Sequence, residues 1–240
     1  AAINMDTPVV LIIFNRPGLT SIVFNAVQKV KPKRLFIVSD GPRNEKERVI
    51  VDETRKIIEQ INWKCNVYKK YSDINLGCRK SVSSGLDWVF SQVEDAIILE
   101  DDCVPDPTFI YFCEDLLEKY RNNKKIMMIS GDNFFKLKSK YSYDFCYHSL
   151  IWGWATWSRA WRQYQIAATS KFALFEEKRS ELTKFVSGRR LDAIKKTLEG
   201  KIDTWDYLWQ YAMLLSGGLC IYPSVNLVKN IGFGSGATHT

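Results

Sequence analysis

Histidine is scarce in this chain of 240 residues, and paired cysteine motifs are missing. The two histidines are His148 and His239, which argues against a zinc site built from several histidines. The six cysteines include no C-x-x-C pair, and several of them lie within apolar runs. This pattern favours buried free thiols in a reducing cytosol, so we expect a cytoplasmic protein.

The motifs of several nucleotide-binding enzymes are also missing. No G-x-G-x-x-G follows the first apolar run, which argues against a dinucleotide dehydrogenase, and no Gly-Lys-Ser/Thr sequence indicates a P-loop. The chain has no G-x-S-x-G turn of an α/β-hydrolase and no acidic pair of a phosphatase on the first strand. A sugar-1-phosphate nucleotidyltransferase needs a Gly-rich loop after that strand, and residues 14–17 do not supply one.

Long apolar runs are absent as well. No segment reaches the length of a membrane span, and the N-terminus lacks a signal-peptide pattern. We interpret residues 1–7 as a leader or tag remnant. The formal charge of +7 fits a basic soluble surface, and it also fits attraction to an anionic ligand or peripheral contact with an anionic membrane face. No nucleic-acid motif accompanies the basic residues, so we expect no nucleic-acid partner.

The chain does contain enough apolar sequence for one sizeable core, with 46% hydrophobic residues. In the first half, apolar runs alternate with amphipathic segments, as in buried parallel strands joined by helices. The order predicts an α/β fold, with a mostly parallel central sheet flanked by helices on both faces. We predict strands at 9–14, 35–39, 65–69, 96–99 and 126–130, and helices from residue 17 and at 45–61, 79–93 and 108–120.

The second half is less regular. Most of the eight tryptophans gather here, between Trp152 and Trp209. Aromatic surfaces suit sugar rings as well as protein cores, so the tryptophans leave both uses open. We predict a late strand at 219–222 and helices near 155–164, 171–187, 189–199 and 204–216.

Polar residues follow the ends of several predicted strands, at 15–16, 39–42, 100–102 and 131–133. Each set alone is compatible with turn chemistry, because Asp, Asn, Gly and Pro all favour turns. The carboxyl ends of parallel strands share one edge of a sheet, and open α/β sheets bind their ligands at that edge. We therefore expect these side chains to form one site.

The acidic turn of Glu100, Asp101 and Asp102 is the sharpest of these signals. Three consecutive carboxylates repel one another, and a divalent cation would relieve that repulsion. Mg²⁺ and Mn²⁺ typically take one or two carboxylates together with waters and phosphate oxygens. A solvated acidic turn accounts for the same residues equally well, so the local sequence favours neither interpretation.

A resemblance to a known family connects these segments. Four segments of the chain together resemble the GT-A glycosyltransferases: 9–16, 39–41, 79–80 and 100–102. The pattern is similar to the N-acetylglucosaminyltransferase I-like family and its bacterial relatives in glycan biosynthesis. It covers the first half and recurs in patches at 153–154, 205–206 and 232–239. The resemblance implies a single GT-A domain at 8–240, with a nucleotide-binding half at 8–133 and an acceptor-side half at 134–240.

The resemblance implies roles for residues of the nucleotide-binding half. Asn15, Arg16 and Asp40 would contact the nucleoside, with Asp40 accepting a hydrogen bond from a uracil ring. Cys78 and Arg79 would lie where the family contacts the base. Contact of Arg79 with the diphosphate, or a place in the solvated start of a helix, is equally compatible with the sequence.

The resemblance also implies a metal site and a closing loop. Asp102 would bind Mn²⁺ or Mg²⁺ directly, and Asp101 would lie near ribose or sugar hydroxyls. Ala237 and Thr238 would belong to a loop that closes on the bound nucleotide. His239 would ligate the metal or touch a phosphate, although a single histidine in a tail is more often uninvolved.

The implied reaction is metal-dependent transfer of a sugar from a UDP-sugar to a glycan or lipid-linked sugar acceptor, with inversion. Glu100 would touch the transferred sugar, and Asp206 would be the general base that deprotonates the acceptor hydroxyl. The sequence departs from the family at Tyr207, where the family has a second aspartate. An aspartate in this Trp-rich helix can equally serve only to cap the helix or to pair with a cationic side chain. A non-catalytic carbohydrate- or partner-binding module on the same scaffold is the alternative.

Overall fold

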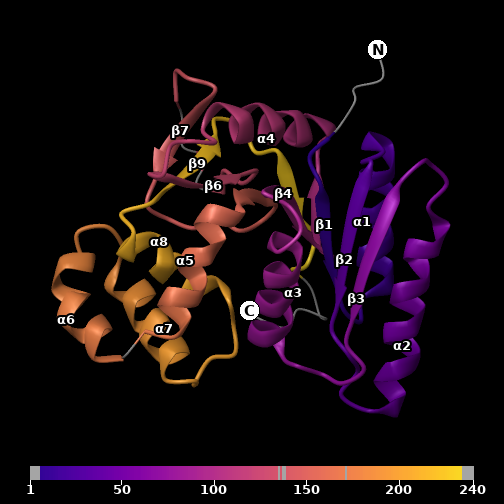
Figure 1. The fold of residues 1–240 in the computed structure, drawn as a ribbon, viewed down its shortest axis with the longest axis horizontal. Helices are drawn as coiled ribbons and strands as arrows, with labels where there is room; N and C mark the ends of the chain where they lie inside the picture. Colours follow the sequence, from indigo (N-terminus) through magenta and orange to yellow (C-terminus); the bar gives the residue numbers. More distant parts are fainter. Residues whose placement is uncertain (1–5, 135, 137–138, 171, 234–240) are drawn as a thin grey trace.

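The computed structural model describes residues 6–134, 136, 139–170 and 172–233. Its main strands are β1 (Val9–Ile13), β2 (Arg34–Ser39), β3 (Asn66–Tyr71), β4 (Asp95–Glu100), β6 (Ile126–Ser130), β7 (Tyr143–Cys146), β8 (Trp154–Trp157) and β9 (Leu219–Pro223). They form an eight-stranded sheet with the order β3-β2-β1-β4-β8-β6-β9-β7 (Figure 1). Two short strands, β5 (Cys103–Pro105) and β10 (Val228–Asn230), form a separate antiparallel pair.

The parallel part of the sheet is built around β1. Every residue of β1 is apolar and buried, as expected of a strand that is covered on both faces. It pairs in parallel with β2 and with β4, and β2 pairs in parallel with β3. β6 pairs in parallel with β9 farther along the sheet. The predicted fold class, a mostly parallel α/β sheet flanked by helices, is confirmed.

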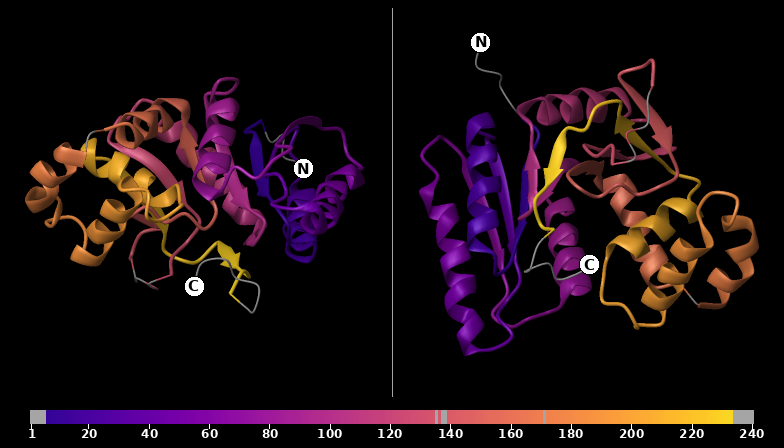
Figure 2. Two further views of the ribbon diagram at one scale, coloured as in Figure 1. Left: turned by 90° about the horizontal axis from the view of Figure 1, so that it is seen from below. Right: turned by 180° about the vertical axis from the view of Figure 1, so that it is seen from behind.

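Helices cover both faces of this sheet. On one face lie α1 (Pro17–Val30), α4 (Pro107–Lys119) and the 3₁₀ helix η1 (Ile57–Gln60), whose apolar side chains pack together against the strands. α2 (Glu45–Lys56) runs directly into η1. On the other face lie α3 (Cys78–Phe90), α5 (Ser158–Ala168), α6 (Phe172–Leu182), α7 (Gly188–Leu198) and α8 (Asp206–Leu215). Figures 1 and 2 show α5 to α8 grouped beyond α3.

Four tryptophans of the second half belong to the core of this helical group, and Trp157 belongs to the core on the other face of the sheet. All five are almost fully buried, and the rings of Trp154 and Trp205 stack with centroids 5.4 Å apart. Trp209 lies between α8 and the sheet, with its ring 5.6 Å from that of Trp154. These five tryptophans therefore contribute to core packing and do not form a sugar-binding surface. They are Trp154, Trp157, Trp161, Trp205 and Trp209.

One predicted element of the second half is wrong at its start. The sequence predicts a helix near 155–164, but residues 154–157 form β8, which lies antiparallel between β4 and β6. α5 begins only at Ser158. Four residues are too few to separate a strand from a helix by periodicity, and the helical spacing of the residues that follow masks the strand. The insertion of β8 separates the end of β6 from the end of β4.

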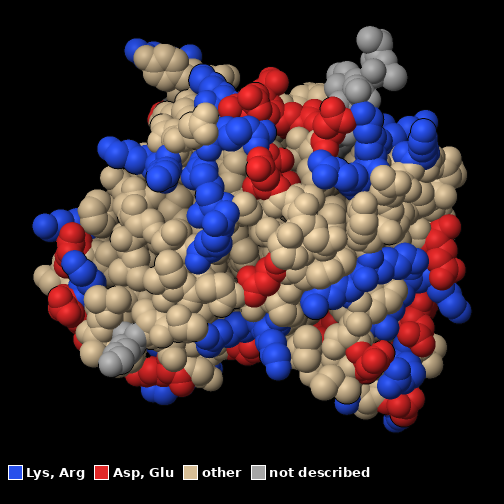
Figure 3. All heavy atoms as spheres, viewed as in Figure 1, with Lys and Arg blue, Asp and Glu red and all other residues tan. Residues whose placement is uncertain are grey.

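Two features of the molecule concern contact with a membrane: the length of its helices and the charge of its surface. Among the described residues, no helix combines the length and the apolar character that crossing a bilayer requires. On the face drawn in Figure 3, Lys and Arg side chains alternate with Asp and Glu side chains. That face is therefore mixed in charge, without one uniform basic surface.

Candidate active site

A cavity of about 340 Å³ lies at the carboxyl ends of β1, β2 and β4. It is bordered by residues 12–16 at the end of β1 and just beyond it, by Asp40 after β2, and by Glu100 and Asp101 at the end of β4. The first turn of α3 and the side chain of Asp203 form the opposite wall. The parallel pairing of the three strands thus brings residues that are far apart in sequence to one place.

Arg16 connects the ends of β1 and β4. Its guanidinium donates to both carboxylate oxygens of Asp101, from Nε at 3.3 Å and from Nη2, and Nη2 also lies 3.1 Å from Oδ2 of Asp102. Burial opposes the charge of Arg16, but the two carboxylates outweigh it and raise its pKa. Burial raises the pKa of Asp101 to about 6, although Arg16 lowers it.

The two predicted catalytic carboxylates share one electrostatic environment. Burial and then the neighbouring carboxylates, including that of Asp206, raise the pKa of Glu100 to about 8. Asp206 is the first residue of α8 and accepts a hydrogen bond from Oγ1 of Thr204. Asp206 is not one of the residues that border the cavity, whereas Glu100 is. Glu100 therefore borders the cavity and is also affected by the charge at the start of α8.

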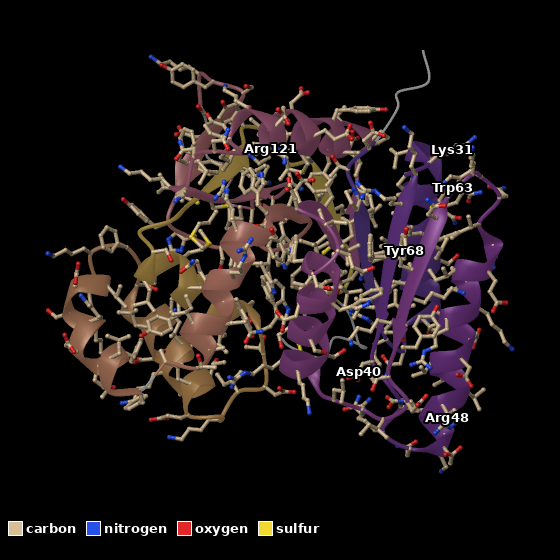
Figure 4. All side chains as sticks on the ribbon, viewed as in Figure 1. Lys31, Asp40, Arg48, Trp63, Tyr68 and Arg121 are labelled. Carbon is tan, nitrogen blue, oxygen red and sulfur yellow. The ribbon has the colours of Figure 1, made fainter. Side chains whose placement is uncertain are left out.

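Asp40 holds the loop that leads from β3 into α3, and Figure 4 places it at the end of β2. Its Oδ1 accepts from the amides of Gly41 and Leu76, each at 2.8 Å. Its Oδ2 accepts from the amide of Gly77 at 3.2 Å and from Nδ2 of Asn75 at 3.0 Å. Burial raises the pKa of Asp40, although these amides lower it. A carboxylate has about four acceptor positions, so a uracil ring would have to share one of them.

Asn15 is held by residues that sequence analysis did not single out. Its Nδ2 donates to Oε1 of Glu47 at 2.7 Å. The carboxylate of Glu47 also accepts from the backbone amide of Arg43 at 2.7 Å and from its guanidinium. The hydrogen bonds from Arg43, reinforced by Asn15, lower the pKa of Glu47 to about 2. Glu47 thus fixes the loop after β1 against α2, which no local motif indicated.

Cys78 and Arg79 open α3, and their side chains take different directions. Cys78 borders the cavity, and burial together with the charges of Glu100 and Asp203 raises the pKa of its thiol to about 12. Arg79 does not border the cavity, and its Nη1 donates to the carbonyl of Thr197 at 3.4 Å. The structure therefore brings Cys78, but not the guanidinium of Arg79, to the predicted nucleotide site.

The C-terminal segment passes directly over Asp102. β10 pairs with β5, and the amide of Ile231 donates to the carbonyl of Asp102 at 2.8 Å. A Cβ on Gly232 would overlap the Asp102 carboxylate, so a larger residue there would push that carboxylate aside. Three residues predicted for the nucleotide and the metal follow this segment and lie outside the described residues, Ala237, Thr238 and His239.

The residues around Asp102 suit a cation that is shared with a phosphate. Within the described ranges no group of three His, Cys, Asp or Glu side chains could hold a metal ion. Mg²⁺ and Mn²⁺ sites that use a substrate diphosphate need only one or two protein carboxylates. The Asp102 side chain is 16% exposed, and Arg16 neutralises part of its charge. Asp102 therefore fits a shared cation and does not fit a closed cage of protein ligands.

Comparisons with known proteins found similarity to solved structures. No protein-family model matches the chain, and no curated protein matches it. The chain is similar to an active-site mutant of LgtC, with a TM-score of 0.41 and 10% identity over 76% of this chain and 66% of that one. It therefore spans slightly less than two thirds of that chain.

Two further solved structures are similar. One is 4-diphosphocytidyl-2C-methyl-D-erythritol synthase from Anaerococcus prevotii DSM 20548, with a TM-score of 0.42 and 12% identity over 88% of this chain and 97% of that one. The other is mouse xyloside xylosyltransferase 1 in its apo form, with a TM-score of 0.47 and 9% identity over 88% of this chain and 81% of that one. At these values the likeness carries no argument about activity, and the function rests on the residues of the site.

Proposed function

We propose that this protein is a glycosyltransferase that moves a sugar from a UDP-sugar to a hydroxyl of a glycan or lipid-linked sugar acceptor. The observation that supports it best is the meeting of Arg16 with Asp101 and Asp102 beside the cavity that Asp40 borders. Such a cavity can receive a nucleoside inside and a diphosphate at its charged rim. The relation to the N-acetylglucosaminyltransferase I-like family, proposed from sequence, assigns the metal to Asp102 and a nucleoside contact to Arg16 and Asp40.

Asp102 would hold Mn²⁺ or Mg²⁺ together with the donor diphosphate, and His239 is the second proposed ligand. When bound, the cation would neutralise the charge that develops on the departing nucleoside diphosphate. Arg16 contacts Asp102 at 3.1 Å, so its guanidinium stands beside the same phosphates and would bind one of their oxygens. Asp101, held by Arg16, would accept a hydrogen bond from a ribose or sugar hydroxyl.

Asp206 and Glu100 would act on the acceptor and on the transferred sugar. Asp206 would take the proton of the acceptor hydroxyl, and a positioned base of this kind contributes roughly 10²- to 10⁴-fold in rate. Glu100, which borders the cavity, would contact a hydroxyl of the transferred sugar. Attack of the acceptor oxygen from the face opposite the phosphate inverts the anomeric carbon.

A thermal-shift panel tests the donor assignment. UDP, GDP, ADP and CDP are each added with and without Mn²⁺, and ligand binding raises the melting temperature in proportion to the logarithm of concentration over Kd. We expect a response to UDP that grows with Mn²⁺. D102N should lose the Mn²⁺-dependent part and keep a weak response to UDP alone.

A second test separates catalysis from binding. D206N should abolish sugar transfer from a UDP-sugar and leave the UDP response intact. Turnover retained in D206N would remove Asp206 from the role of base. A protein that responds to no nucleotide in the panel is the non-catalytic binding module instead of the transferase.

A further inference from the structure

Asp203 supplies a cap to a helix that is remote in sequence. It lies in the loop between α7 and α8, and its carboxylate accepts hydrogen bonds from two backbone amides at the start of α3. Oδ2 accepts from Cys78 at 2.9 Å and Oδ1 accepts from Arg79 at 3.2 Å, across 125 and 124 positions of sequence. The residue at the N-cap position of α3 is Gly77, which has no side chain to cap the helix itself.

The backbone at Gly77 is shaped around this contact. Gly77 has a φ of +82°, which favours glycine, and a Cβ there would lie 2.5 Å from Oδ2 of Asp203. Another side chain at position 77 would therefore be strained and would also displace the Asp203 carboxylate. Glycine at this position and the capping aspartate belong to one arrangement.

This cap changes where a diphosphate can bind. Amides at a helix N-terminus commonly receive phosphate oxygens, but here Asp203 occupies the amides of Cys78 and Arg79 and places a negative charge on the cavity wall. A phosphate at this end of α3 would be repelled. The cationic side chains that border the same cavity are Arg16 and Arg43, and Arg16 lies beside Asp101 and Asp102.

The cap also fixes the segment that carries the proposed base. Asp203 and Asp206 are separated by two residues, and Thr204 between them donates through Oγ1 to Asp206. The segment is thus held at α3 by one carboxylate, and it carries the other at the first residue of α8. Sequence analysis missed Asp203 because its partners lie far along the chain.

We propose that Asp203 is a positioning residue for the transfer reaction. It would anchor the proposed acceptor-side half (134–240) to α3 in the nucleotide-binding half (8–133), and so hold Asp206 at a fixed distance from the donor. It would also keep the diphosphate away from the start of α3. This inference rests on the proposed function, because the role of Asp206 as base is part of that function.

Steady-state kinetics with UDP-sugar and acceptor, together with UDP titration by calorimetry, test the proposal on D203A and D203N. Loss of positioning should lower kcat of D203A about 10- to 100-fold, since small displacements of a catalytic group cost rates of that order. Removal of a negative charge from the cavity wall should at the same time tighten UDP binding about 2- to 5-fold. D203N keeps one acceptor oxygen and should lose less kcat than D203A.

Asp106 offers a matched control. It caps α4 by accepting from the amide of Thr108 at 2.9 Å, and it does not border the cavity. D106A should lower the melting temperature about as much as D203A and leave both kcat and UDP affinity unchanged. A purely structural role for Asp203 would make the two variants alike, and that result would overturn the proposal.

Amide exchange separates this inference from the proposed function. The amides of Cys78 and Arg79 should exchange about 5- to 10-fold faster in D203A, as expected for a lost helix cap. Unchanged exchange would overturn the inference even in an active enzyme. A wild-type protein without any UDP response overturns the proposed function, and with it the positioning role, even if the exchange rates confirm the cap.

Discussion

The guanidinium of Arg16 and the carboxylate of Asp101 form an ion pair with two hydrogen bonds, across 85 positions of sequence. Arg16 follows β1 and Asp101 follows β4, and these strands are direct neighbours in the sheet. The pair therefore joins two strand ends at the rim of the cavity. A nearly buried carboxylate is costly without a cation, so the pair stabilises the fold and also presents a cation to an incoming phosphate.

Replacing Arg16 with Met should lower the free energy of unfolding by about 2–3 kcal/mol at pH 7, because Asp101 would be left buried without its partner. Urea unfolding measures the loss. R16M/D101N should recover at least about 1 kcal/mol relative to the sum of the single losses. Arg48 pairs with Glu45 on the surface, with side chains 45% and 83% exposed, so R48M should change stability by less than about 0.5 kcal/mol. Equal losses in R16M and R48M would contradict the prediction.

Glu47 should make the free energy of unfolding depend on pH in the acidic range. Its pKa is lowered from 4.5 to about 2 in the fold, mainly by Arg43, so its stabilisation is complete above pH 4.5 and is lost as the pH falls towards 2. Arg43 is 57% exposed, and solvent screening limits the effect of E47Q at pH 7 to about 1 kcal/mol. The difference between wild type and E47Q should shrink steadily between pH 4.5 and pH 3 in chemical unfolding. A difference that is constant with pH would contradict this origin.

Gly232 should matter for the proposed metal site more than for the fold. A Cβ at this position overlaps the carboxylate of Asp102, so G232A should displace that side chain and weaken Mn²⁺-dependent UDP binding about 10-fold or more. Calorimetric titration with and without Mn²⁺ measures the change. Gly188 has open space around its Cβ position, and G188A should bind UDP and Mn²⁺ like wild type. The prediction fails if G232A binds as tightly as G188A.

The parallel strands were predictable because their signal is local. β1, β2, β4 and β6 are apolar and buried nearly throughout, and turn-forming residues bound them, so each can be recognised without knowing its partners. β8 could not be recognised in this way, because its four residues lie directly before α5 and share its aromatic character. Its position between β4 and β6 is set by tertiary pairing alone.

The residues of the site also fall into those with a local sequence signal and those without one. Arg16, Asp40 and Glu100 could be predicted, because each directly follows or ends a recognisable strand and parallel strands end at one edge. Glu47 and Asp203 could not, since each acts through contacts with residues far along the chain. Nothing local distinguishes Asp203 from any other loop aspartate. The residues that position the site are therefore harder to read from sequence than the residues that line it.

The pH dependence of stability that we predict for Asp132 has the opposite sign to that predicted for Glu47. Asp132 follows β6 and is 4% exposed, and burial raises the pKa of its carboxyl to about 6, although the backbone amide of Phe134 lowers it. A folded pKa above the ordinary value of 3.8 means that the fold favours the protonated form. The cost of ionising Asp132 is thus absent below pH 3.8 and grows as the pH rises to about 6.

D132N removes this cost and keeps the shape of the side chain. The variant should match wild type near pH 4 and exceed it above pH 6 by on the order of 1–2 kcal/mol, which corresponds to roughly 2–8 °C in Tm for a chain of this size. Thermal melts at intervals between pH 4 and pH 8 measure the difference, and the melts at pH 4 act as the internal control. A variant that is less stable than wild type at pH 7 would mean that the ionised carboxylate has a stabilising partner, and burial would then not govern this side chain.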